Sequence, residues 1–226
     1  MQRVEEIRVR TADWPAYERR PVDATLRALD VVVALVGFLL LAPVLVLVAA
    51  AILLTCGRPL LYRGTRIGRD GRVFEMYKFR TLAPDAETRL GPYYGEELAL
   101  RTTSEETCLG PWLRAAQLDE LPQLWNVLRG DMSMVGPRPL RPALFEQVLA
   151  ELPGSWQRLM VRPGLSGLAQ TRVGRDEPWA AKFTHDREYV AGRSVGLYLR
   201  GVAAMIVSFV AHVANAATSL PEGRRP

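Results

Sequence analysis

The chain has 226 residues, of which 49% are hydrophobic and 23% charged, so it is long enough for one sizeable domain and too apolar for a disordered protein. Its formal net charge of +5 comes from arginine far more than from lysine, which suits phosphates, anionic lipids or nucleic acid. The two cysteines and two histidines exclude a disulfide framework and a histidine-based metal centre.

The segment from Val31 to Leu54 contains no charged residue. A straight helix of that length reaches roughly 36 Å and could cross a bilayer core of about 30 Å, so a transmembrane helix is the default interpretation. Two features favour a re-entrant helix-break-helix instead. Pro43 removes a hydrogen bond in the middle of the run, and arginines flank both ends, which the positive-inside rule keeps in the cytoplasm. We therefore expect a surface segment at 1–30 and a hairpin at 31–55 that enters one leaflet and returns.

Two strands are expected after the apolar run, at Leu60 to Ile67 and Arg72 to Phe79, around a turn at Gly68 to Gly71. The second strand leads into a pair of cations, Lys78 and Arg80. They are either solvated residues of an edge strand or a pair aimed at phosphate, and the strand pattern does not choose between these alternatives.

The most informative run extends from Leu118 to Pro139 and begins with two adjacent carboxylates, Asp119 and Glu120. Pro122 is tolerated only in the first turn of a helix, so the carboxylates sit at or just before a helix N-terminus. The helix dipole there favours an ionised carboxylate and attracts phosphate. Taken alone, the pair fits a helix cap better than a catalytic pair. The helix is indicated by apolar residues at three- and four-residue spacing and by a glycine stop: Leu121, Leu124, Trp125, Leu128 and Gly130.

Arg138 lies between two prolines in the loop that follows this helix. The segment from Arg162 to Gln170 is dense in turn residues, so we expect it to lie against other backbone or a ligand. Asp186 and Tyr189 are three residues apart and share one face if Trp179 to Gly192 is helical.

Other segments complete the predicted architecture. A short helix near Trp112 carries Arg114 towards the carboxylates, and an amphipathic helix covers Arg141 to Leu152. Residues 194–217 are apolar but interrupted by an arginine and a histidine. They form either a second span or a helix that lies on the membrane, and the tail at 218–226 is expected to be disordered.

Together these pieces resemble the small monotopic polyprenyl-phosphate phosphoglycosyl transferases, also called bacterial sugar transferases. The resemblance runs from about Asp30 to about Val190 and implies an α+β, mostly helical fold: a re-entrant membrane hairpin, a compact cytosolic catalytic domain at 56–193 with a small β-hairpin, and interfacial amphipathic helices. The matching motifs stand in order along the chain: the apolar run with Pro43, Gly68-Arg69-Asp70-Gly71, Tyr77-Lys78-Phe79-Arg80-Thr81, Leu113-Arg114, Leu118 to Pro139, Pro163 to Gln170, and Asp186 with Tyr189.

The resemblance implies transfer of a sugar 1-phosphate from a UDP-sugar to polyprenyl (undecaprenyl) phosphate, at the cytoplasmic face of a bacterial inner membrane, to initiate glycoconjugate or polysaccharide assembly. Asp119 would be the nucleophile that forms a covalent phosphosugar intermediate and releases UMP, and Glu120 would help to hold Mg²⁺. The implied partners are the two substrates and membrane lipids, with no nucleic acid and with homo-oligomerisation left open. The implied substrate- and phosphate-binding residues are Lys78, Arg80, Arg114, Arg138, Gln170, Arg175, Asp186 and Tyr189.

The sequence departs from the family pattern at three places, one of which, Gln117 in place of a common serine, we interpret as neutral. Ala42 replaces a serine that is frequent before the hairpin proline, and Thr171-Arg172-Val173-Gly174-Arg175 replaces V-N-G-R, which displaces Arg175 by one position. A membrane-anchored basic scaffold without catalysis is the rival hypothesis, and it leaves the placement of Asp119 and Glu120 unexplained. Nucleic-acid binding has only the basic pI behind it.

Overall fold

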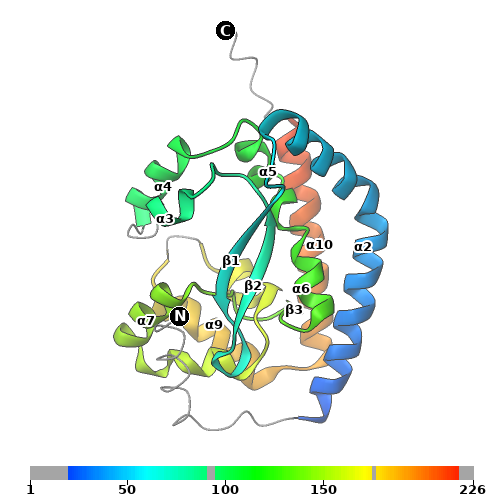
Figure 1. Cartoon of the computed structure of the whole chain (residues 1–226). Coiled ribbons are helices and arrows are strands. Elements are labelled where there is room, and N and C mark those ends of the chain that lie inside the picture. The colour runs from blue at the N-terminus through cyan, green and yellow to red at the C-terminus, as the bar shows by residue number, and fades with distance from the viewer. Residues whose placement is uncertain (1–19, 91–94, 175–176, 219–226) are drawn as a thin grey trace. The chain divides into compact units, whose positions relative to one another are not determined.

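The computed structural model describes residues 20–90, 95–174 and 177–218, and Figure 1 shows its helices and strands. The described chain is mostly helical, as the family resemblance implies, and it has two small sheets. It divides into two compact units. Unit 1 comprises the chain up to Leu40 with Arg63–Met76 and Gln123–Met205, and unit 2 comprises Leu41–Tyr62, Tyr77–Pro122 and the chain from Ile206 onwards. Residues 1–19 and 219–226, which hold most of the predicted surface segment and tail, lie outside the described residues.

Helix α2 (Pro21–Cys56) contains the predicted hairpin and begins well before it. Its start is defined by a reciprocal cap: the Arg20 N–H donates to the Asp23 carboxylate at 2.7 Å, and the Asp23 N–H donates to the Arg20 carbonyl at 2.9 Å. Pro21 fits the first helical position because no acceptor is needed for its missing N–H. The helix continues through Pro43, so the predicted break is not an end of one helix and the start of another.

Helices α2 and α10 (Val195–Thr218) are both long and apolar enough to cross a membrane, and only 11% of the most apolar window of each is buried. The second agrees with the apolar helix predicted at 194–217. Large apolar side chains exposed in rows are unfavourable in water and mark a lipid or protein contact, so the two helices indicate membrane association. The most exposed of these side chains include Leu39, Leu40, Val46, Leu47 and Leu54 on α2, and Val207 and Val210 on α10.

The predicted β-hairpin is confirmed as β1 (Leu61–Ile67) and β2 (Val73–Phe79), which pair in a two-stranded sheet. A single 3-10 turn, η1 (Arg69–Gly71), joins them. Asp70 adopts a φ of 57° and Gly71 a φ of 70°, which Gly and Asp tolerate better than most residues.

A second sheet, formed by β3 (Ser133–Val135) and β4 (Gly164–Ser166), was not predicted. The two strands run parallel, so a long crossover must connect them. Helix α7 (Pro142–Glu151) and the 3-10 helix η3 (Pro153–Met160) form that crossover, and α7 was predicted.

Glycine allows close backbone contact beside this sheet. A Cβ on Gly136 would lie 2.5 Å from the Arg162 carbonyl oxygen, and a Cβ on Gly164 would collide with the backbone nitrogen of Gly136. The prediction that the turn-rich segment lies against other backbone is therefore confirmed.

Asp30 of α2 connects three elements of unit 1 through one buried carboxylate oxygen. Its Oδ1 accepts hydrogen bonds from the Ser133 hydroxyl at 2.8 Å, the Met134 N–H at 2.8 Å and the Tyr198 hydroxyl at 3.0 Å. Three donors offset the cost of burying the carboxylate. The first turns of α2 are thereby fixed to β3 and α10.

The remaining elements are short. The short helix that carries Arg114 is confirmed as α5 (Gly110–Ala115). The helix that carries Asp186 is confirmed as α9 (Trp179–Gly192). The elements are α3 (Ala86–Leu90), α4 (Gly95–Ser104), α5 (Gly110–Ala115), the 3-10 turn η2 (Leu118–Glu120), α6 (Gln123–Arg129), α8 (Leu168–Arg172) and α9 (Trp179–Gly192).

The predicted apolar face of α6 is partly wrong. Trp125 is 51% exposed, whereas two polar residues, Gln123 and Asn126, are buried. The Asn126 side-chain amide donates to the Glu75 carbonyl at 2.7 Å, and the backbone carbonyl of Asn126 accepts from the Asp131 N–H at 3.0 Å. The buried face of α6 therefore includes Gln123 and Asn126, while Leu121 and Leu124 are buried as predicted.

Candidate functional site

Asp119 and Glu120 belong to η2, which ends just before α6 begins at Gln123, as the sequence predicts. Gln117 before them has a φ of 56°, and this left-handed residue turns the chain sharply after α5. Leu118 is buried in an apolar cluster of unit 2, so the carboxylate turn is anchored to its core. The cluster also contains Val48 and Ile52 of α2, Phe79, Leu113, Ala116, Leu121 and Ala216 of α10.

Lys78 of β2 lies against both carboxylates. Its Nζ is 3.7 Å from Asp119 Oδ2 and donates to Glu120 Oε1. The Lys78 side chain is 17% exposed and the Asp119 side chain 9%, so this is not a solvated edge lysine. The structure thus brings together a cation and two carboxylates that the sequence separates by about forty residues.

Arg114 of α5 is held beside this group by two acceptors. Its Nε donates to the Thr81 hydroxyl at 3.0 Å, and its Nη1 donates to the Glu106 carboxylate at 3.1 Å. Glu106 was not predicted as part of the site, and it is positioned by an isolated β-bridge to Leu82. Nothing in its local sequence distinguishes it from the other glutamates of a polar segment.

Burial raises the pKa of the Asp119 carboxyl above its usual value, and the nearby Glu120 raises it further. The positive charges of Lys78 and Arg114 oppose the rise. The backbone hydrogen bond at this turn favours the ionised form, as expected of a helix terminus, but burial outweighs it. A single 3-10 turn supplies a weak dipole, and desolvation outweighs it. A carboxylate with little water around it is a good nucleophile when neighbouring cations keep it ionised.

Arg80 is buried and directed at backbone carbonyls after the end of α2. Its Nε donates to the Pro59 carbonyl at 2.6 Å, and its Nη2 donates to those of Cys56 at 2.6 Å and Gly57 at 3.0 Å. The last carbonyls of a helix have no partner inside the helix, so Arg80 acts as a C-terminal cap. Its predicted contact with phosphate stays a prediction.

The other predicted residues belong to unit 1, where Asp186 forms a buried ion pair that the sequence did not reveal. Its carboxylate lies 3.0 Å from the Arg158 guanidinium of η3, and the two side chains are 4% and 5% exposed. Burial raises the pKa of Asp186, and Arg158 opposes the rise. Arg158 also donates to the Arg138 carbonyl at 3.0 Å, so the pair fixes the backbone of the Arg138 loop while the Arg138 side chain is exposed. No local pattern marks Arg158 as a buried residue.

Tyr189, one turn after Asp186, donates its hydroxyl to the Val135 carbonyl at 2.7 Å. Gln170 donates to the Leu165 carbonyl at 3.5 Å, and its Oε1 is buried without a hydrogen-bond partner among the described residues. Ligand binding by Tyr189 and Gln170 is untested by these contacts and stays a prediction.

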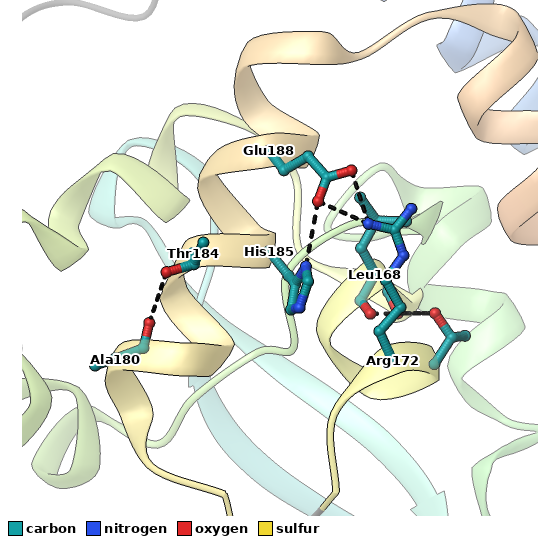
Figure 2. A network of polar contacts seen from close by, with 8 residues as sticks. Leu168, Arg172, Ala180, Thr184, His185 and Glu188 are labelled. Carbon is teal, nitrogen blue, oxygen red and sulfur yellow. Dashed lines mark hydrogen bonds and ion pairs between the residues drawn. The ribbon is translucent and has the colours of Figure 1, made fainter.

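Arg175 lies outside the described residues, but the neighbouring Arg172 of α8 is described. Figure 2 shows its guanidinium against Glu188 of α9, with Nη1 2.7 Å from each carboxylate oxygen and the His185 ring on one of those oxygens at 3.2 Å. Hydrogen bonds from Arg172 and His185 lower the pKa of Glu188. Arg172 therefore links α8 to α9 in the segment where the sequence departs from the family pattern.

Comparison with known proteins gives a consistent picture. The family model for bacterial sugar transferases matches residues 22–212. A UDP-glucose:undecaprenyl-phosphate glucose-1-phosphate transferase of Caulobacter vibrioides is 46% identical over 154 residues, which are 68% of this chain and 56% of the relative. A UDP-N-acetylgalactosamine-undecaprenyl-phosphate N-acetylgalactosaminephosphotransferase of Aeromonas hydrophila is 33% identical over 174 residues, 76% of this chain and 40% of the relative. The exopolysaccharide production protein PSS of Rhizobium leguminosarum bv. phaseoli is 35% identical over 193 residues, 80% of this chain and 93% of the relative. The chain thus spans about half the length of the first two relatives.

Proposed function

The chain belongs to the bacterial sugar transferase family, and from this premise we propose that it transfers a sugar 1-phosphate from a UDP-sugar to polyprenyl phosphate, with undecaprenyl phosphate as the carrier. The observation that carries the proposal is the partly buried group of Asp119, Glu120 and Lys78, with Arg114 nearby. A non-catalytic basic scaffold would have no need for a desolvated carboxylate beside two cations.

In the proposed first step, an Asp119 carboxylate oxygen attacks the phosphorus that carries the sugar. The bond between that phosphorus and the UMP oxygen breaks, UMP leaves, and the sugar phosphate is joined to Asp119. In the second step, a phosphate oxygen of the polyprenyl carrier attacks the same phosphorus and restores the free carboxylate. Lys78 and Arg114 neutralise negative charge on the phosphoryl oxygens, which otherwise repels an anionic nucleophile.

We propose Mg²⁺ as the cofactor, with Glu120 as its protein ligand. Mg²⁺ in phosphate-transfer sites takes one or two carboxylates and fills its other positions with substrate phosphates and water. Glu120 supplies one such carboxylate next to the proposed nucleophile, so the residues present fit this mode of binding. Bound Mg²⁺ would neutralise the diphosphate. Glu120 is half-buried and meets a cation, Lys78, in the structure, so its carboxylate is oriented for a positive charge.

The test is UMP release by the purified full-length chain in detergent or lipid nanodiscs. We expect release from at least one of UDP-glucose, UDP-galactose and their N-acetylated amino-sugar analogues when undecaprenyl phosphate and Mg²⁺ are present. EDTA is expected to stop the release and added Mg²⁺ to restore it. No release from any sugar nucleotide by a protein with an intact helical circular dichroism spectrum would contradict the proposal.

We further propose that α2 is re-entrant, so that the protein is monotopic with its active site on the cytoplasmic face of the inner membrane. Both ends of α2 are bound by polar parts of the chain. Arg27 near its start donates to the Val127 and Leu128 carbonyls at 2.6 and 2.8 Å, and the Cys56 carbonyl at its end accepts from Arg80. Among the described residues, no other helix of spanning length lies between α2 and α10, so the chain does not cross the membrane again between these helices. The residues that bind the two ends of α2 all lie in that stretch of the chain. Both ends of α2 therefore belong on the same side, and Pro43 is where the helix can bend.

Cysteine labelling tests this topology. In a Cys56→Ser/Cys108→Ser background, single cysteines at Arg10→Cys and Arg69→Cys are expected to resist a membrane-impermeant thiol reagent added outside intact cells. Both are expected to react after permeabilisation, which is the control for accessibility. Reaction at only one of the two positions in intact cells would mean that α2 spans the membrane.

A further inference from the structure

The only two cysteines of the chain, Cys56 and Cys108, meet in unit 2. They are 52 residues apart in sequence, and their sulfur atoms lie 3.6 Å apart. Both are free thiols, and neither contributes to the transfer reaction proposed above. Their meeting in a chain with no other cysteine needs a chemical reason beyond packing, because Cys108 is exposed and does not fill the core.

The cysteines stand on two segments that carry the candidate active site. Cys56 is the last residue of α2, and its carbonyl accepts a hydrogen bond from Arg80. Cys108 lies between α4 and α5, one residue after Thr107, whose N–H donates to the Thr81 carbonyl at 3.0 Å. The preceding Glu106 holds Arg114. A covalent link between the two sulfurs would therefore join the end of the apolar helix to the segment that positions Arg114.

The geometry is close to that of a disulfide without being one. A disulfide requires a separation of about 2.05 Å, so the sulfurs must approach by roughly 1.5 Å. Cys108 is exposed and Cys56 half-buried, so a small oxidant can reach the pair. In a reducing compartment such a pair stays in the dithiol form, and a disulfide that forms there is transient and regulatory rather than structural.

We propose that Cys56 and Cys108 are a reversible redox modification site, which hydroperoxides oxidise to a disulfide and cellular thiols reduce again. The Cys108 thiolate attacks a peroxide oxygen and becomes a sulfenic acid, while the O–O bond breaks and hydroxide leaves, taking up the proton lost by the thiol to give water. The Cys56 thiol then attacks the sulfenic sulfur, and hydroxide leaves with the thiol proton as water. Two thiols and one hydrogen peroxide give one disulfide and two waters.

The disulfide is expected to slow turnover. Closing the gap moves the Cys108 segment relative to α2, and with it Glu106 and Arg114, whose charge acts on Asp119. Displacement of a charged group by about 1 Å costs up to about a hundredfold in rate, so we expect an activity loss of about tenfold or more. This second part rests on the proposed function, whereas disulfide formation does not.

The test uses the purified full-length chain treated with hydrogen peroxide. We expect an intact mass lower by two hydrogen atoms, a crosslinked pair of peptides that contain Cys56 and Cys108, and reversal by dithiothreitol. Cys56→Ser and Cys108→Ser are the matched variants, expected to keep the reduced activity, to form no internal disulfide and to lose little activity in peroxide. Disulfide formation no faster than in the urea-unfolded chain, or only disulfides between chains, would overturn the proposal. An internal disulfide with unchanged UMP release in a protein active when reduced would overturn its regulatory part.

Discussion

Asp119→Asn is expected to lower turnover by about a thousandfold or more while the protein stays folded. The substitution keeps the size and burial of the side chain and removes the nucleophilic oxygen charge. It also removes one of the two carboxylates that Lys78 contacts, yet Glu120 still accepts from that ammonium group. The loss therefore reports on chemistry at Asp119 rather than on collapse of the turn.

Covalent labelling measures the effect directly. After incubation with a UDP-sugar labelled in the phosphate next to the sugar, wild-type protein is expected to retain the label through denaturation, and Asp119→Asn is not. Asp85→Asn is the matched control, because Asp85 is exposed and has a φ of 60° that asparagine also tolerates. Equal labelling of the Asp119→Asn variant and wild type would rule out Asp119 as the covalent nucleophile.

The same variant gives an independent reading of stability against pH. The pKa of Asp119 is raised in the folded protein, so folding disfavours its ionised form. Wild-type stability therefore rises as pH falls through the folded pKa towards the unfolded value. Asparagine cannot titrate at this position. We therefore expect Asp119→Asn to have a higher free energy of unfolding than wild type at neutral pH, and we expect this difference to shrink as the pH is lowered.

The sequence predicted those features that depend on neighbours along the chain. The β1–β2 hairpin follows from two strand-like runs around Gly68 to Gly71, and the start and end of α6 follow from Pro122 and the glycine stop. Close backbone packing at Gly164 follows from the density of turn residues. In each case the determining residues lie within a few positions of one another.

Features set by distant residues were missed or misjudged. The buried face of α6 includes Asn126, whose side chain donates to the Glu75 carbonyl, and it leaves Trp125 exposed. The C-terminal cap of α2 comes from Arg80, which lies twenty-four residues after Cys56 in the sequence. Strands of three residues such as β3 and β4 have too few positions for an alternating pattern to stand out. The candidate site residues were predicted from residue type and motif, and whether they bind substrate stays a prediction, while their partners required the fold.

Asp186→Ala is expected to lower the free energy of unfolding by about 3–5 kcal/mol, because it leaves the guanidinium of Arg158 buried without its counterion. The loss is expected to appear as a lower midpoint in denaturant or thermal unfolding of the detergent-solubilised protein. Glu188→Gln is the control on the same helix. This substitution breaks the ion pair between Glu188 and Arg172, in which both side chains are nearly half exposed, so we expect little change in the free energy of unfolding.

A double variant separates the loss of the pair from the loss of a buried charge. Replacing both partners with apolar residues of similar size, as in Arg158→Met/Asp186→Leu, removes the unpaired ion and is expected to recover most of the stability. Arg158 also donates to the Arg138 carbonyl, so the double variant loses that hydrogen bond as well. We therefore expect the double variant to have near-normal stability but a less ordered Arg138 loop. If Arg138 binds phosphate, the KM for the sugar nucleotide is expected to rise. A single Asp186→Ala variant as stable as wild type would contradict this role of the ion pair, because Arg158 would then have found another partner or water.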